Sequence, residues 1–256
     1  MPSASKSGWQ IEVDNGCQTY LFQRGSPYHL VSPADPTASL VEAEDGSAVT
    51  FCQGDRTLAF YGFGTDMPEE LQGSLNQVTL PSGHVYTVNY NTSPSPQPGA
   101  PLNAPLSISR DDAQELYQIQ YDAQGNLGSL AHQIQSGGSW KQTVQVSFDY
   151  HAADGDYGLL GDLKAVHTNV FDAQSGAWVQ QQATYYTYDS ATGQVRHVFD
   201  ARQYQALLTA TGKSDLNDFD QATDDATLAA YAGQSYTYCN GQVATQTCPA
   251  RRNSCL

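Results

Sequence analysis

The chain has little charge, and little of that charge is positive. Only 14% of its 256 residues are charged, and 26 acidic residues against 11 basic ones give a net charge of −15. Binding to nucleic acid phosphates needs a basic surface, and so does docking on an anionic membrane. The composition therefore argues against nucleic acid and membrane surfaces as partners, and it is typical of a soluble secreted or cell-surface protein.

The sequence also lacks long apolar runs and the motifs of common catalytic sites. No segment approaches the roughly 20 apolar residues of a membrane-spanning helix. Residues 1–8 hold one Lys and no apolar core, so no signal peptide is expected there. A G-x-S-x-G elbow, a phosphate-binding loop and an H-E-x-x-H helix are all missing from the sequence. We therefore expect no membrane span, no enzymatic activity and no cofactor.

Cysteine is scarce, and its spacing does not suggest a metal site. The odd number of cysteines leaves at least one thiol unpaired in a monomer. Two of them lie in strand-like segments, as core residues or as a bridged pair, and three crowd the C-terminal tail without a C-x-x-C pair. Zinc is therefore not expected. The five are Cys17, Cys52, Cys239, Cys248 and Cys255.

What the chain does contain is a recurring pattern. A run of alternating apolar and polar residues leads to an aromatic–Asp pair and then to a turn that contains Gly. An Asp at a turn entry accepts hydrogen bonds from the main chain two residues on, and Gly adopts the positive φ that closes the turn. The pattern predicts successive β-hairpins. Its copies are Tyr121-Asp122 with Gly125, Phe148-Asp149 with Gly155, Phe171-Asp172 with Gly176, and Tyr188-Asp189 with Gly193.

Two other segments interrupt these strands. Residues 93–105 hold five prolines, which predict an extended spacer. Between 200 and 232, apolar residues recur at helical spacing on both sides of an acidic stretch, which predicts two short helices. We therefore expect an N-terminal β-hairpin region (1–92), a linker (93–105), repeat strands (106–198), a helical insertion (199–233) and a final strand with a Cys-containing tail (234–256).

The repeated segments resemble those of the YD-repeat proteins, the Rhs family. The matching segments are YDAQGNL at 121–127, FDAQSG at 171–176 and YDSATGQV at 188–195, and VTLPSGHVYTVNYN at 78–91 is similar to another hairpin of the family. The resemblance covers roughly residues 9–243. It implies an all-β fold, an antiparallel hairpin sheet that curves or spirals into a shell. In the family, such shells enclose a C-terminal toxin or effector segment of secreted toxins and cell-surface proteins.

The chain departs from the YD-repeat pattern in two respects. It is too short to close such a shell alone, and it lacks the family's Asp-Pro-x-Gly self-cleavage segment. Neither toxin activity nor self-cleavage is therefore expected. The resemblance implies an N-terminal or truncated repeat segment that acts as a non-enzymatic scaffold. Its open sheet edges would pair with the remainder of a shell or with a second copy.

Two other functions stay open on the sequence alone. Exposed aromatic rings could stack on carbohydrate or dock a protein partner, although cross-strand packing of the same rings is the competing interpretation. A glycan-cleaving β enzyme would need two carboxylates at a distance that only the fold sets. The candidate stacking residues are Trp140, Trp178, Tyr185 and Tyr186.

The acidic stretch between the predicted helices is a weak candidate for calcium. Its candidate ligands are Asp215, Asp218 and Asp220. A calcium loop also needs a Gly at its bend and a late bidentate Glu, and both are missing here. Stabilisation of the following helix N-terminus explains these charges better.

Overall fold

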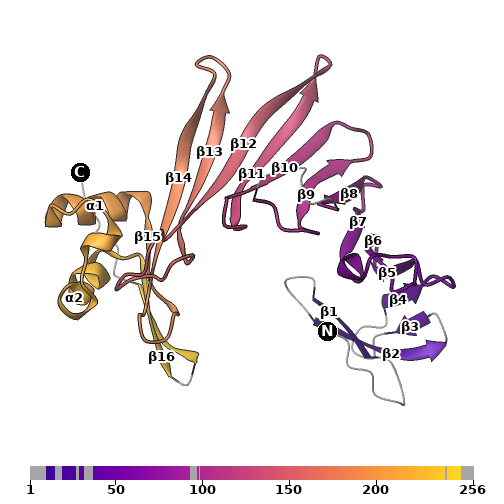
Figure 1. The fold of residues 1–256 in the computed structure, drawn as a ribbon, viewed down its shortest axis with the longest axis horizontal. Coiled ribbons are helices and arrows are strands. Elements are labelled where there is room, and N and C mark those ends of the chain that lie inside the picture. Colours follow the sequence, from indigo (N-terminus) through magenta and orange to yellow (C-terminus); the bar gives the residue numbers. More distant parts are fainter. Residues whose placement is uncertain are drawn as a thin grey trace. The chain divides into compact units, whose positions relative to one another are not determined.

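The computed structural model describes residues 10–14, 19–26, 29–31, 37–92, 97, 99–239 and 241–248. Within them, the chain forms mostly β-strands joined by turns, together with two short α-helices (Figure 1). Every strand pair whose register is described runs antiparallel and joins strands that are consecutive in the sequence. The predicted all-β class, built from antiparallel hairpins, is therefore confirmed.

The chain divides into two compact units. Unit 1 comprises residues 1–118 and 133–141, and unit 2 comprises residues 119–132 and 142–256. Three strands contribute residues to both units: β10 (Glu115–Tyr121), β11 (Leu127–Ser136) and β12 (Ser139–Tyr150).

Unit 1 is a meander with its core on β4, β5 and β6. Leu40, Phe51 and Leu58 lie opposite one another on these strands and are almost fully buried. Since alternate side chains of a strand share a face, one apolar row becomes the buried face. The strands are β1 (Gln10–Asp14), β2 (Thr19–Ser26), β3 (His29–Val31), β4 (Ala38–Glu42), β5 (Ala48–Gln53), β6 (Arg56–Tyr61), β7 (Leu75–Thr79), β8 (Val85–Tyr90) and β9 (Pro105–Arg110), with a 3₁₀ turn at Glu69–Leu71.

The predicted Pro-rich spacer lies inside unit 1, between β8 and β9. Most of residues 93–98 lie outside the described residues, whereas Pro105 is the first residue of β9. Asn91 is buried, and its side-chain amide donates hydrogen bonds to the main-chain carbonyls of Ala100 and Pro101, each at 3.1 Å. Residues 100 and 101 of the segment are therefore bonded to the residue that directly follows β8.

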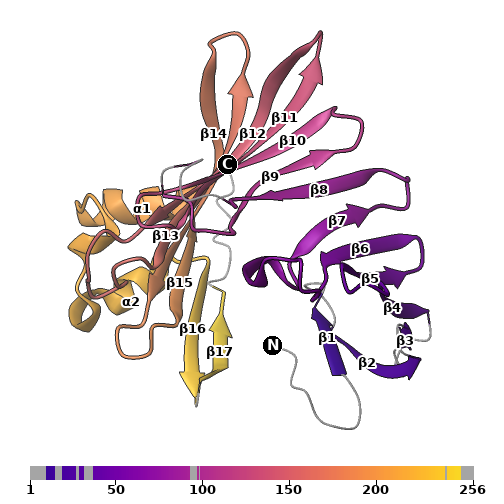
Figure 2. The same ribbon diagram turned by 45° about the vertical axis from the view of Figure 1, so that its right-hand side comes forward.

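In unit 2, each strand from β12 to β17 pairs with the next, and β13 and β14 form a long hairpin (Figure 2). The strands that follow β12 are β13 (Leu163–Asp172), β14 (Ala177–Tyr188), β15 (Val195–Asp200), β16 (Gln234–Cys239) and β17 (Gln242–Thr247).

The two predicted helices are confirmed. They are α1 (Ala201–Thr211) and α2 (Gln221–Tyr231), separated by a 3₁₀ turn at Leu216–Asp218, and they lie between β15 and β16. Asp200 caps α1 in a capping box with Gln203, and Asp220 caps α2. The helices and the sheet share the core of unit 2, which consists of Tyr157, Phe199, Tyr204, Leu207, Leu216, Phe219, Leu228 and Ala232.

None of the helices within the described ranges is long and apolar enough to cross a membrane. Three cysteines, Cys52, Cys239 and Cys248, are free thiols. Cys52 is half-buried, with its Sγ 3.9 Å from the Thr57 hydroxyl. Because Cys52 is a free thiol, the predicted alternative in which it is bridged to Cys17 is wrong. Cys17 and Cys255 lie outside the described residues, so a core position for Cys17 stays a prediction.

Candidate functional site

A tyrosine at the last or next-to-last position of a strand anchors each of four adjacent strand pairs. Its hydroxyl donates a hydrogen bond to the main-chain carbonyl of the first residue in the preceding strand. One such bond lies in unit 1 and three lie in unit 2. The pairs are Tyr90 with Leu75 at 2.6 Å, Tyr150 with Leu127 at 2.9 Å, Tyr188 with Leu163 at 2.7 Å, and Tyr238 with Val195 at 2.7 Å.

A register shift accompanies every one of these tyrosines. In the pairing with the following strand, the register shifts between the tyrosine and the residue before it. A bulge bends its strand and changes the direction of the side chain that follows, and here that side chain is the anchoring tyrosine. The shifts lie at Asn89/Tyr90, Asp149/Tyr150, Thr187/Tyr188 and Thr237/Tyr238.

Burial keeps the anchoring hydroxyls protonated. It raises the pKa of Tyr188 to about 12, and it also raises the pKa of Tyr150 and of Tyr238. A protonated hydroxyl can donate to the carbonyl, and the carbonyl of each half-buried acceptor residue gains a donor. Each tyrosine therefore satisfies a main-chain group at the start of a strand.

Three of the four predicted Asp–Gly turns have the expected geometry. The Asp122 carboxylate accepts from the main-chain nitrogen of Gln124 at 2.9 Å, Asp172 accepts from Gln174 at 2.9 Å, and Asp189 accepts from Thr192 at 2.9 Å. The hydrogen bond from the Ser175 hydroxyl lowers the pKa of Asp172 below its usual range. The glycines adopt positive φ: Gly125 at 88°, Gly176 at 68° and Gly193 at 66°.

The fourth copy was placed wrongly. Asp149 does not enter a turn but lies inside β12, where its carboxylate is 2.9 Å from Nε2 of His167. The strand continues for one more residue, and Tyr150 rather than Phe148 takes the anchoring position. Because side chains two apart share a face, an aromatic at either position fits the same alternating pattern. Gly155, the turn residue assigned to this copy, has no positive φ.

The predicted stacking residues are split between the two units. Trp140 lies in unit 1 and is 41% exposed, whereas Trp178, Tyr185 and Tyr186 lie in unit 2. The Tyr185 ring stacks on Tyr204 of α1 with 3.9 Å between centroids, so this side chain belongs to the core of unit 2. Trp178 packs edge-on against Phe171 across the β13–β14 hairpin, and Tyr186 pairs with Val198 and is half-buried.

A buried histidine joins α2 to the sheet. His197 of β15 is 2% exposed, with Nε2 3.0 Å from the Asp225 carboxylate of α2 and Nδ1 2.9 Å from the Ser235 hydroxyl of β16. Arg196 binds Asp225 with two nitrogens, and this contact lowers the pKa of Asp225. Burial lowers the pKa of His197, which favours the neutral imidazole.

These contacts include the residue types of a Ser–His–Asp triad, but they hold the fold together instead of opening to a substrate. A catalytic histidine must reach the reacting group, and the His197 ring lies almost wholly out of solvent beneath α2. The sequence gives no local signal for this cluster, because Asp225 and Ser235 follow His197 by 28 and 38 residues.

A second buried histidine joins the 3₁₀ turn between the helices to the sheet. His151 is 1% exposed, and its Nδ1 lies 3.1 Å from the side-chain oxygen of Asn217. Its ring packs on Gly158, where a Cβ atom would come within 2.4 Å of Nε2. Burial lowers the pKa of His151 as well. His197 therefore connects the helical insertion to β15 and β16, and His151 connects it to the loop that follows β12.

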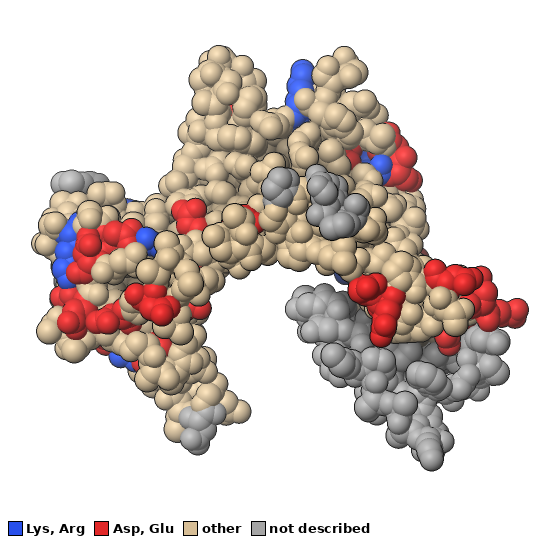
Figure 3. All heavy atoms as spheres, in the orientation of Figure 1, with Lys and Arg blue, Asp and Glu red and all other residues tan. Residues whose placement is uncertain are grey.

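The carboxylates predicted as weak calcium ligands serve the helices of the insertion. Asp215 contacts Lys164 with both oxygens at 2.7 Å, Asp218 accepts from the Ser214 main chain and hydroxyl, and Asp220 caps α2. Figure 3 shows basic side chains among the acidic ones over this region. Helix capping and ion pairing thus account for these charges.

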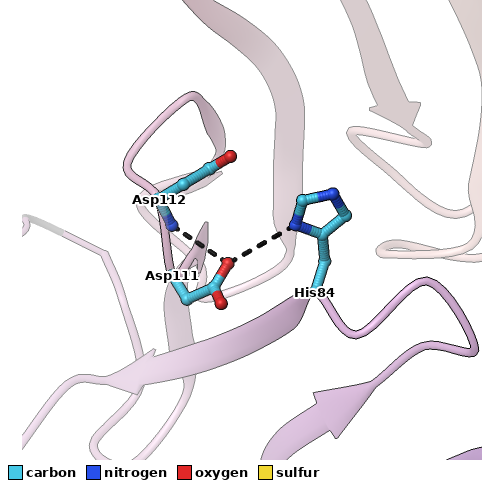
Figure 4. A group of neighbouring side chains, drawn as sticks. All are labelled: His84, Asp111 and Asp112. Carbon is cyan, nitrogen blue, oxygen red and sulfur yellow. Dashed lines mark hydrogen bonds and ion pairs between the residues drawn. The ribbon is translucent and has the colours of Figure 1, made fainter.

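One group in unit 1 has the residue types of a metal site: His84, Asp111 and Asp112 (Figure 4). Nδ1 of His84 lies 3.7 Å from Asp111, and these two side chains are 45% and 46% exposed. Arg110 donates to Asp112 at 2.6 Å and lowers the pKa of Asp112. The positive charge of Arg110, bonded to Asp112, disfavours binding of a divalent cation by these three residues. They are therefore a cluster of ion pairs at the surface.

Comparisons with known proteins assign no family. No family model matches the chain, and no curated protein matches it significantly. Its function must therefore be inferred from its own contacts, among which the tyrosine anchors are the most regular.

The tyrosine anchors predict a specific loss of stability. Tyr188→Phe removes the hydroxyl that donates to Leu163, and we expect the free energy of unfolding in denaturant to fall by about 1 to 2 kcal/mol, because the carbonyl of the half-buried Leu163 loses this donor. The control is Tyr186→Phe, whose hydroxyl makes no hydrogen bond within the described part of the chain. Equal losses in both variants would contradict an anchoring role.

The close packing of Gly158 on His151 predicts a steric effect. Gly158→Ala places a methyl group against the His151 ring, and we expect unfolding to become easier by about 1 to 3 kcal/mol. Gly155→Ala, in the same loop, is the control, since its Cβ would meet its nearest neighbour at an ordinary 3.8 Å. Thermal denaturation that ranks the two variants equally would rule out this contact as the cause.

The buried histidines predict a pH dependence. Their folded pKa values lie below the unfolded value of about 6.5, so the unfolded chain takes up protons first on acidification. Stability that is present above about pH 6.5 is therefore lost as the pH falls toward the folded pKa values. We expect each histidine to contribute a slope of up to about 1.4 kcal/mol per pH unit. His197→Gln should flatten the profile, and an unchanged slope would contradict the assignment.

Proposed function

We propose that this chain is a non-enzymatic structural module, a section of β-sheet wall of the YD-repeat type from a secreted or cell-surface protein. The observation that carries this proposal is the tyrosine anchor, which recurs with its register shift at the ends of β8, β12, β14 and β16. Each anchor bonds the two strands of its own hairpin. Hairpins of different length can thus be added in series without changing those already present.

The Tyr–Asp pair itself supports the YD-repeat assignment. At Tyr188-Asp189, the tyrosine anchors the preceding strand and the aspartate closes the next turn with Gly193. Two adjacent residues therefore complete one hairpin and start the next. Among the four anchors this combination occurs once, since Tyr90, Tyr150 and Tyr238 are followed by Asn91, His151 and Cys239.

The non-enzymatic assignment is supported by how the reactive groups are used. The Ser235, His197 and Asp225 side chains bond to one another between the sheet and α2. Asp215 and Asp220 cap helical segments. The remainder of a shell, or a second copy paired through sheet edges, is the partner that fits such a module.

A carbohydrate- or protein-binding role is the alternative, and one observation favours it. The Trp140 ring is 41% exposed on β12 and can contact a ligand. Binding of this kind would quench tryptophan fluorescence on addition of glycans, and Trp140→Phe would remove the response.

The structural role is tested by molar mass. We expect light scattering behind size exclusion, across a tenfold range of protein concentration, to report oligomers that grow with concentration. A compact monomer throughout the range would contradict the wall module. Glycan-dependent quenching in such a monomer would establish the binding role instead.

A further inference from the structure

Within the part of the chain that the structure describes, β16 is the strand with which β17 has a paired register, and the other edge of β17 lacks the usual protection. All six side chains of β17 are exposed. Proteins guard edge strands with charged residues or prolines, because unpaired main-chain groups otherwise recruit another strand. The sequence of β17, QVATQT, contains neither. Val243 is 56% exposed at this edge.

The anchor pattern indicates which kind of strand fits the edge. In β7, β11, β13 and β15, the carbonyl of the first residue accepts a tyrosine hydroxyl from the end of the next strand. β17 holds the same place in the series, because it follows the anchoring Tyr238 and a turn in which Gly241 has φ 77°. Among the described residues, the carbonyl of Gln242 receives no such hydroxyl.

We propose that the free edge of β17 binds an extended strand of another polypeptide in antiparallel register, with a terminal tyrosine whose hydroxyl donates to the Gln242 carbonyl. This inference rests on the proposed structural function and specifies the partner that it needs. Main-chain hydrogen bonds supply the affinity, and the tyrosine sets the register.

Charge restricts the partner further. Strands β16 and β17 carry no charged side chain between them, although the chain as a whole has a net charge of −15. Burying a charge against this uncharged edge would have a desolvation cost without an opposite charge to compensate. The partner strand is therefore one of alternating apolar and uncharged polar residues that ends in tyrosine.

The test uses a fluorescent peptide, VQQQATYYTY, which copies residues 179–188, carries no charged side chain and ends in the anchoring Tyr188 of this chain. We expect saturable binding to the full chain, measured by fluorescence anisotropy. The same peptide with Tyr188→Phe should bind about 3- to 10-fold more weakly, because one hydrogen bond is lost. Equal binding of the two peptides would contradict the proposed hydrogen bond from the tyrosine hydroxyl to the Gln242 carbonyl.

Two further controls identify the edge. Val243→Lys should abolish binding, whereas Leu160→Lys adds the same charge at a residue that is 66% exposed outside β17 and should not. Two further peptides carry N-methyl groups at alternate main-chain nitrogens, so that each has the hydrogen-bond donors of one edge blocked. Because only one edge of the peptide pairs with β17, we expect one of these peptides to bind and the other not to bind. Binding that survives Val243→Lys, or equal binding of both methylated peptides, would overturn edge pairing at β17.

The outcome is independent of the molar-mass test. If the chain forms oligomers but does not bind the peptide, the proposed structural function stands and the proposed strand partner of β17 is refuted. Peptide binding to a chain that stays monomeric would support the partner and contradict assembly of the wall by self-association.

Discussion

The hydrogen bond from a tyrosine hydroxyl to a strand's first carbonyl is the interaction on which this sheet depends. A meander has a weak point wherever a strand begins, because the turn before it leaves main-chain groups without ladder partners. Here a side chain from the neighbouring strand fills that need, and a bulge directs it there. The aromatic ring also covers the strand end, so one residue both satisfies a polar group and buries apolar surface.

The helical insertion depends on a different device. Its apolar core packs on β14 and β15, while two buried histidines fix its polar side to the sheet. Because burial lowers the pKa of both imidazoles and favours their neutral form, each contact is a hydrogen bond whose geometry specifies one position. Arg196 forms an ion pair with Asp225, so the carboxylate that contacts His197 is not left as an unpaired charge.

Local sequence was sufficient to predict the features that local chemistry decides. The turn at Tyr188-Asp189 and the helix that starts after Asp200 depend on residues within four positions of one another. The sequence predicted none of the tyrosine anchors, because their acceptors lie 15 to 43 residues away. It also assigned the motif to Phe148 instead of Tyr150, because an alternating strand fits equally well when shifted by two residues. The contact between His197 and Asp225 could not be predicted either, since it forms only when α2 folds back over β15.

The anchor spans very different lengths of chain. Tyr90 follows its acceptor by 15 residues, whereas Tyr238 follows its acceptor by 43, with both helices in between. The entropy of closing a loop rises only slowly with its length, so the same bond can hold a tight turn or an inserted segment. The tip of each hairpin is thus a natural grafting position, where evolution or an engineer can add a folded element while the sheet beneath keeps its register.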